Sequence, residues 1–286
     1  AQRWRAKLVF DAEDFHSGMR LSATAPGIDD EIIEYIERLY LARCAYITAA
    51  SEGIADAYAA KYAIRQPVPV LNMFPLAQRP MDRRHHDASD PVTLYWFSQT
   101  IGKNRGIEDV VQAIGLLTGR NIELHLVGKW QPGYRTQLFQ LAAAFGVKEA
   151  QVIDHAPQQP DEMVRFAARF DVGLALEEPG SVNRDLCLTN KIFTYLLAGN
   201  TVIASATQGQ SQFMKKIGGA GFLYQPGDIA ALAGRIEFLY NDRTALEAAR
   251  QRAWDCATRE YNWDLERTKF LRVVAAAVGQ EKERVS

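Results

Sequence analysis

The stretch "LCLTNKIFTYLLAGNTVIAS" (residues 186–205) indicates how the larger part of this chain folds. A polar Thr-Asn-Lys start is followed by apolar residues at helical spacing, so we predict a helix over residues 190–198 that ends at Gly199. The β-branched residues that follow predict a strand over residues 201–204. A helix that passes into a strand through so short a connection is typical of an alternating α/β domain.

The same alternation extends on both sides of this stretch. We predict strands over residues 92–98, 123–127, 151–154, 172–176, 201–204 and 221–224, and helices over residues 107–117, 135–145, 161–170, 190–198 and 229–240. Strands and helices joined in this order by short loops form right-handed crossovers, and hence a parallel sheet covered by helices on both faces. Residues 90–241 are therefore predicted to be a Rossmann-like domain.

Residues 1–89 are predicted to form a partial N-terminal α/β domain followed by a linker. The predicted elements are strands over residues 7–11, 45–49 and 69–72, a helix over residues 30–41 and a second helix capped by Ser51, with a polar linker over residues 78–91. Residues 242–286 are expected to form two helices that return toward the N-terminal domain. Because a domain usually has about 100–200 residues, we expect the N-terminal domain to lack its first strands.

The composition excludes several classes of protein. The 33 basic and 34 acidic side chains give a net charge of −1, whereas nucleic-acid binders usually carry a basic surplus. Three widely separated cysteines argue against a disulfide framework or a zinc site, so we expect a cytoplasmic protein. No apolar run approaches the roughly 18 residues of a membrane span. Peripheral membrane contact remains compatible with the sequence.

The loop after the first strand of the Rossmann-like domain has the residues of a phosphate site. Ligands of such sheets bind beyond the carboxyl ends of the strands, where helices begin. This loop reads "QTIGKNRG" (residues 99–106). Gly102 lets the backbone approach a ligand, while Lys103 and Arg105 bring positive charge to a helix N-terminus. These features favour a bound phosphate or diphosphate.

Lys191 provides a second cation at the same edge of the sheet. It lies in the first turn of a helix, where a cation is unfavourable unless an anion binds there. We therefore favour one diphosphate held by both loops, with Asn190 beside it. The alternative is that the cations are only solvated and that Asn190 caps the helix. Neither G-x-G-x-x-G nor G-x-x-x-x-G-K-[ST] is present, which disfavours a dehydrogenase or an NTPase.

Two more groups of residues follow predicted strands. His155 ends the third strand of the Rossmann-like domain, and we expect it to line a nucleotide cleft together with Ala156. The N-terminal loop contains Glu13, Asp14 and His16, which are the candidate catalytic residues or ligand contacts. A loop cap with solvated charges explains these three residues equally well.

The order of these motifs resembles the retaining nucleotide-sugar glycosyltransferases of family 4, which have the two-domain GT-B fold. The resemblance covers most of the chain. Its most specific part is "NKIFTYLLAGNTVIAS" (residues 190–205), which is similar to a subgroup pattern Asn-Lys-x-Phe-x-Tyr-x-x-x-Gly before an apolar strand. "LYWFSQTIGKNRGIEDVVQAI" (residues 94–114) resembles the first strand and helix of the donor domain. "YITAASEGIADAYAAKY" (residues 46–62) resembles the end of the N-terminal domain.

The resemblance implies transfer of a sugar from a UDP- or GDP-linked donor, which is the substrate, with no cofactor and no metal. It implies that Arg105, helped by Lys103, holds the diphosphate, as do backbone N–H groups of residues 189–191, including Thr189. Groups that follow the fourth strand would hold ribose or donor-sugar hydroxyls. The residues expected in that role are Glu177, Glu178, Asp185 and Thr194.

The chain also departs from the family pattern. Many members carry two glutamates separated by seven residues; Thr194 takes the place of the second, and only Asp185 lies beside the place of the first. The nucleotide and the acceptor, whether glycan, lipid or small molecule, are left open. A general base among Asp11, Glu13 and Asp14 would suit inversion, whereas the resemblance favours retention. The alternatives are a non-catalytic nucleotide- or sugar-binding module, an inactive fragment of such an enzyme, or an α/β scaffold without nucleotide affinity.

Overall fold

The computed structural model describes residues 6–83, 87 and 89–279. The chain divides into two compact units. The first contains residues 1–72, 179–188 and 263–286, and the second contains residues 73–178 and 189–262. The expected linker includes residues 84–86 and 88, which lie outside the described residues. The domain boundaries expected from the sequence stay a prediction.

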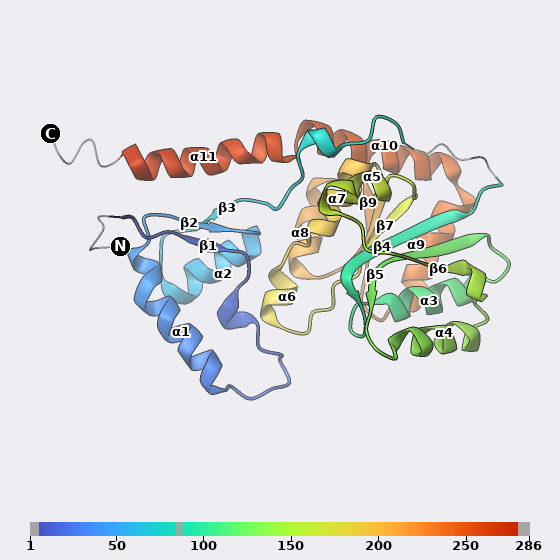
Figure 1. The fold of residues 1–286 in the computed structure, drawn as a ribbon, viewed down its shortest axis with the longest axis horizontal. Helices are drawn as coiled ribbons and strands as arrows, with labels where there is room; N and C mark the ends of the chain where they lie inside the picture. Colours follow the sequence, from blue (N-terminus) through green and yellow to red (C-terminus); the bar gives the residue numbers. More distant parts are fainter. Residues whose placement is uncertain (1–5, 84–86, 88, 280–286) are drawn as a thin grey trace. The chain divides into compact units, whose positions relative to one another are not determined.

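The second unit is built on a six-stranded parallel sheet (Figure 1). Its strands are β4 (Val92–Ile101), β5 (Ile122–Trp130), β6 (Val152–His155), β7 (Val172–Ala175), β8 (Thr201–Ser205) and β9 (Gly221–Tyr224). The spatial order is β6-β5-β4-β7-β8-β9, and every neighbouring pair is parallel. This order reverses between β4 and β7, which confirms the predicted Rossmann-like sheet.

Helices cover both faces of this sheet. They are α3 (Ile107–Leu116), α4 (Tyr134–Ala144), α5 (Met163–Ala167), α7 (Asn190–Ala198), α8 (Gln208–Lys216), α9 (Ile229–Asn241) and α10 (Arg243–Arg259). α3 packs on α4 and α9 on one face, while α7 packs on α5 and α10 on the other. Side chains of β4 point alternately to the two faces of the sheet. Leu94 and Trp96 pack in the core beneath α3, whereas Tyr95 stacks on Phe170 with ring centroids 4.6 Å apart.

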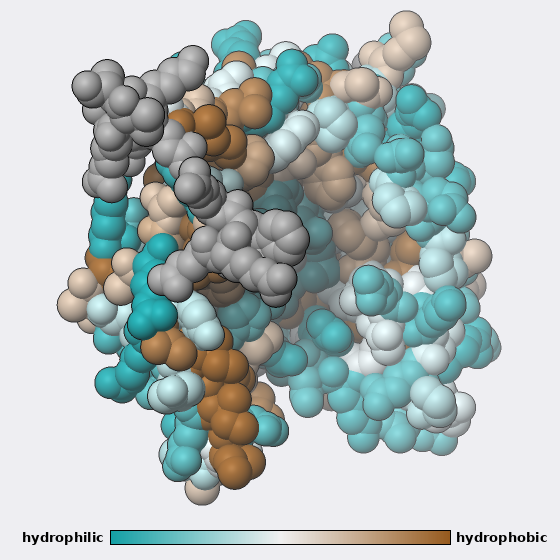
Figure 2. Space-filling model, turned by 60° about the vertical axis from the view of Figure 1, so that its left-hand side comes forward, coloured by the Kyte–Doolittle hydropathy of each residue, from teal (hydrophilic) through white to brown (hydrophobic). Residues whose placement is uncertain are grey.

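The first unit contains a three-stranded parallel sheet of order β1-β2-β3. Its elements are β1 (Phe10–Ala12), β2 (Ile47–Ala49), β3 (Val68–Pro69), α1 (Ile28–Tyr40), α2 (Glu52–Tyr62), α6 (Val182–Leu186) and α11 (Trp263–Gly279). Ser51 caps α2 as predicted, since its Oγ accepts from the N–H of Ile54 at 3.1 Å. Along α1, Ile28, Ile32 and Ile36 are exposed, and Figure 2 shows a brown stripe where this helix lies.

Two helices were not expected from the sequence. The segment that follows β8 forms α8, with Thr207 as its cap. The stretch between β7 and α7 contains α6, which is capped by Ser181. Both helices lack a sustained apolar spacing, because α8 opens with polar residues and α6 has only five residues. β3 is shorter than predicted, and β4 extends to Ile101 with a register shift after Phe97.

Gly173 in β7 allows α7 to approach the sheet closely. A Cβ at this position would lie 2.1 Å from Cγ of Tyr195, whose ring is fully buried and whose hydroxyl donates to the Leu174 carbonyl at 3.0 Å. Gly173→Ala is therefore expected to lower the free energy of unfolding by about 1–3 kcal/mol in urea denaturation, because overpacking forces the ring or the strand to move.

Gly234→Ala is the matched control for this substitution. Gly234 lies on the exposed side of α9, and an added Cβ meets no atom within 4 Å. Alanine should raise the helix propensity there and stabilise the protein by about 0.5–1 kcal/mol. Equal effects of the two substitutions would contradict the close approach of α7 to Gly173.

Candidate functional site

The loops after β4 and β7 meet where the order of the strands reverses, because these strands are neighbours. Gly106 caps α3 with φ +71°, and its N–H donates to Glu178 Oε1 at 3.1 Å. A Cβ on Gly106 would lie 2.8 Å from Cβ of Leu176. A Cβ on Gly102 would lie 2.5 Å from Oε1 of Gln131. These two glycines thus bring protein groups together, and the expected approach of a ligand to Gly102 stays a prediction.

Lys191 forms an ion pair with Glu177 at this edge of the sheet. Its ammonium lies in the first turn of α7 and donates to Glu177 Oε1 at 2.7 Å. The side chains of Lys191 and Glu177 are only 12% and 24% exposed. Ser205 donates from its Oγ to the carbonyl oxygen of Glu177 at 2.6 Å, which fixes the backbone of this loop. The sequence does not reveal an anion that offsets the charge of a cation at this helix N-terminus. In the structure, the carboxylate of Glu177 is that anion.

Arg105 acts on the same carboxylate. The charge of Lys191 is the main cause that holds the pKa of Glu177 below its usual value, while burial opposes it. Hydrogen bonds from Lys191 and Thr189 and the charge of Arg105 lower this pKa further. Lys191 binds this carboxylate directly, and the charge of Arg105 also acts on it, so both cations that were predicted to share a ligand lie near one anionic group. With Glu178 on the N–H of Gly106, the two cations share this edge with two carboxylates; Lys103 in the same loop is exposed.

The N-terminus of α7 adds hydrogen-bonding groups to this cluster. Thr189 is the N-cap, and its Oγ1 accepts from the N–H of Lys191 at 3.5 Å and from Lys191 Nζ at 3.4 Å. Asn190 is the first residue of the helix and is exposed. The first turn of a helix carries a partial positive charge. The structure thus brings Thr189, Asn190 and Lys191 together with Glu177 at a half-buried helix start.

The four residues expected to hold ribose or donor-sugar hydroxyls do not lie together in the structure. Glu177 faces the cations, and Glu178 accepts from the N–H of Gly106. Thr194 is fully buried, and its Oγ1 donates to the carbonyl of Asn190 at 3.4 Å, so the structure does not place it in the cluster of cations. Asp185 lies on α6 in the first unit.

The catalytic candidates lie in the first unit and have partners there. Asp14 Oδ1 accepts from the Asn183 amide at 2.7 Å, and Asn183 Oδ1 accepts from the N–H of Phe15 at 2.7 Å. Glu13 is exposed and accepts from the Asn72 amide at 2.6 Å. The contacts of Asp14 therefore fasten α6 to the N-terminal loop, a structural role that differs from the loop cap with solvated charges considered from the sequence.

His16 and Asn183 complete this loop. The N–H of His16 donates to the Tyr58 hydroxyl at 3.2 Å, and its ring lies 6.2 Å from that of Phe10. Asn183 is 6% exposed, and the sequence analysis did not identify it as a site residue. No local pattern points to it, because its partner Phe15 is 168 positions away. The catalytic roles of Glu13, Asp14 and His16 stay predictions.

His155 is paired with a second histidine. Its Nε2 lies 2.9 Å from Nδ1 of His125, whose Nε2 lies 3.1 Å from Glu123 Oε2. Burial, and then the charge of Arg169, lower the pKa of His155, while Asp154 opposes the shift. The ring of His155 also packs edge-on against Phe166, 5.2 Å between centroids. The structure thus brings His155 together with buried aromatic rings; its role in a nucleotide cleft, with Ala156, stays a prediction.

Two searches over the described residues bear on metals and membranes. No group of three or more His, Cys, Asp or Glu side chains in the described part of the chain is arranged to hold a metal ion. Among the same residues, no helix has both the length and the apolar character that crossing a membrane requires.

Comparison with known proteins gives a family and a set of similar folds. The model of the family described as Glycosyl transferases group 1 matches residues 91–242. HepE from Anabaena, solved in complex with UDP, is similar over 95% of this chain and 73% of its own, with 17% identity and a TM-score of 0.75. Sucrose-phosphate synthase from Thermosynechococcus elongatus is similar over 98% and 70%, with 17% identity and a TM-score of 0.75.

TarM from S. aureus, also solved with UDP, is similar over 94% of this chain and has 13% identity and a TM-score of 0.71. The chain spans 50% of the length of TarM. At these identities the similarity shows the shared fold. No curated protein matches the chain.

Proposed function

The chain belongs to the family Glycosyl transferases group 1, and from this premise we propose that it moves a sugar from a nucleotide diphosphate sugar to an acceptor. The acceptor is a glycan, a lipid or a small molecule. The observation that carries this proposal is the half-buried ion pair of Lys191 with Glu177, next to the loop that carries Arg105, at the edge of the sheet where such folds bind ligands.

The proposed donor site uses this cluster for the diphosphate. Lys191 and Arg105 provide the charge, and the N-terminus of α7 provides backbone donors of the kind that bind phosphates elsewhere. Glu177 already binds Lys191. The diphosphate therefore has to share Lys191 with that carboxylate or replace the carboxylate there. UDP is the first nucleotide to test, since HepE and TarM were solved with it.

The proposed chemistry follows from the charge of the leaving group. As the bond between the sugar and the diphosphate breaks, negative charge grows on the phosphate oxygens. Cations and helix dipoles that are fixed in place stabilise that charge without reorganising. We propose that Arg105 and Lys191 perform this role without a metal, and that the anomeric configuration is retained.

Arg105→Ala tests the donor site with little risk to the fold, since Arg105 is half-exposed. We expect the Kd for UDP in calorimetric titration to rise about 10-fold, because a charge-assisted contact to phosphate is lost. Arg120→Ala is the control: Arg120 pairs with Glu237 at 3.1 Å near the amino end of β5, away from the ligand-binding edge. UDP affinity that is unchanged in Arg105→Ala would contradict the assignment of Arg105.

One observation favours a second candidate function. Thr194 occupies the helix position at which the resemblance leads us to expect a glutamate, and it is fully buried. A non-catalytic module that binds a nucleotide sugar fits a site without that carboxylate. Incubation with UDP- and GDP-sugars decides between the two: release of free nucleotide, even at a slow hydrolytic rate, excludes the non-catalytic module, whereas UDP binding without any release from any donor favours it.

A further inference from the structure

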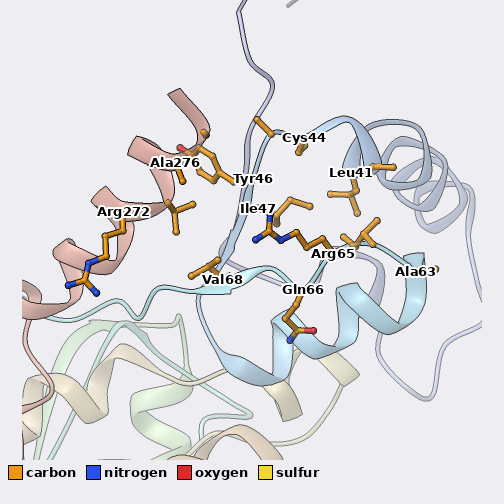
Figure 3. Close-up of a pocket in the computed structure, with 15 residues that line it drawn as sticks. Leu41, Cys44, Tyr46, Ile47, Ala63, Arg65, Gln66, Val68, Arg272 and Ala276 are labelled. Carbon is orange, nitrogen blue, oxygen red and sulfur yellow. The ribbon is translucent and has the colours of Figure 1, made fainter. Parts of the chain in front are cut away.

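A pocket lies within the first unit, whereas the proposed donor site belongs to the second. Its volume is about 510 Å³. Residues before and at the start of β2, the loop after α2, the start of β3 and the C-terminal half of α11 line it (Figure 3). The pocket therefore lies at the amino ends of β2 and β3, whereas ligands of parallel sheets usually bind at the carboxyl ends. A site here would be separate from catalysis.

The lining of this pocket combines an apolar wall with positive charge. Ile47, Val68 and Val273 contribute aliphatic surface, and the charged residues that line it are Arg65 and Arg272. None of the described lining residues carries a carboxylate. A further cation lies at the edge, because the ammonium of Lys7 donates to the carbonyl of the lining residue Ala277.

Arg65 is the cation placed to meet a ligand. Figure 3 shows its side chain beside Ile47 and directed toward α11, whereas Arg272 projects from α11 away from the other labelled residues. Within the described residues, Arg65 is exposed and forms no ion pair. The neighbouring Gln66 directs its amide to Asp56 of α2 at 2.6 Å, so this carboxylate is already engaged.

The loop that carries Arg65 begins with an unusual backbone conformation. Ala63 ends α2 with φ +50° and ψ +41°, in the left-handed region that favours glycine. A residue with a Cβ pays about 1–2 kcal/mol for that conformation. Helices commonly end in this way, and the loop that follows Ala63 carries Arg65.

From these observations we propose that this pocket binds an amphipathic anion: a molecule with one alkyl chain and an anionic head group. The alkyl chain lies on Ile47, Val68 and Val273, and the carboxylate or phosphate of the head binds the guanidinium of Arg65, which offers paired N–H donors. The volume falls in the range of about 300–1,000 Å³ that is usual for small-molecule sites.

Titration calorimetry of the whole chain with dodecanoate and with dodecyl phosphate tests the proposal. Dodecyltrimethylammonium, which has the same chain and the opposite charge, is the matched ligand control. We expect at least one of the anions to bind and the cation to bind at least 10-fold more weakly. The two anions distinguish a carboxylate from a phosphate head group, and either result is compatible with the site.

Substitutions then locate the binding. Arg65→Gln should raise the Kd of the preferred anion about 10-fold or more, while Arg272→Gln should change it less than about threefold. Val273→Trp should fill the pocket and reduce the binding of either anion. UDP affinity should be unchanged in all three variants, which separates this site from the donor site. Binding of neither anion, equal binding of the cation, or an equal loss in Arg65→Gln and Arg272→Gln would overturn the proposal.

Discussion

Lys191→Met is expected to raise the Kd for UDP roughly 100-fold and to lower the free energy of unfolding by about 1–3 kcal/mol. Binding is weakened for two reasons. The diphosphate loses a cation, and Glu177 then faces it without the partner that now lies 2.7 Å away. Stability falls because a carboxylate that is 24% exposed loses its nearest counter-charge. Calorimetry with UDP and urea denaturation measure the two effects separately.

The double variant Lys191→Met/Glu177→Gln separates folding from binding. Removal of both charges should recover most of the stability, because no unpaired carboxylate remains, while UDP affinity stays low. Recovery of UDP affinity together with stability would show that Lys191 acts only on the fold.

The loss of stability in Lys191→Met also has a defined pH dependence. Because the folded pKa of Glu177 lies below its ordinary value of 4.5, the pair stabilises the wild type above that value. This contribution is lost as the pH falls through the folded pKa. The difference in stability between the wild type and Lys191→Met should therefore be largest near neutral pH and shrink in acid.

Arg250→Met is expected to have the largest effect on stability, a loss of about 3–5 kcal/mol in urea denaturation. Arg250 and Asp171 are both fully buried, with 3.7 Å between Nη1 and Oδ1. Asp171 Oδ2 also accepts from the N–H and the hydroxyl of Thr93, at 2.9 and 2.8 Å, and Arg250 Nε donates to the Gly199 carbonyl at 3.2 Å. The substitution leaves a buried carboxylate without its cation.

Arg252→Met provides the matched control, because Arg252 lies on the same helix, is exposed and donates to the carbonyl of Gly218. Its loss should change stability by less than about 1 kcal/mol. Addition of Asp171→Asn to Arg250→Met should recover part of the loss. A loss below 1 kcal/mol in Arg250→Met would contradict a structural role for this pair.

The sheet of the second unit was predictable because its signals are local. Each strand is a short apolar run and most helices have a clear apolar face, so residues 190–198 were assigned with the bounds that the structure shows. The helices that were missed, α6 and α8, are stabilised by caps and by tertiary burial. Phe213 and Met214 of α8 are buried, yet the four residues before Phe213 are Gly-Gln-Ser-Gln.

The site was predictable only in part. The topology of a parallel sheet places the loops after β4 and β7 at one edge, and so Arg105 and Lys191 were expected to meet. Sequence reasoning did not reveal that Glu177 pairs with Lys191, because the pairing depends on how the loop after β7 folds back. It also did not reveal that Asp14 is bound to Asn183, since their contact joins segments 169 positions apart.

The most direct test of the account compares UDP with UMP, which lacks the second phosphate. The Kd of each nucleotide is measured for the wild type, Arg105→Ala, Lys191→Met and the double variant Arg105→Ala/Lys191→Met. If both cations hold one diphosphate, the wild type binds UDP more tightly than UMP, each single substitution removes most of that advantage, and the effects of the two substitutions on UDP affinity are not additive. The shared diphosphate site would be contradicted if the wild type bound UDP no more tightly than UMP. It would also be contradicted if Arg105→Ala/Lys191→Met still bound UDP more tightly than UMP by the same factor as the wild type.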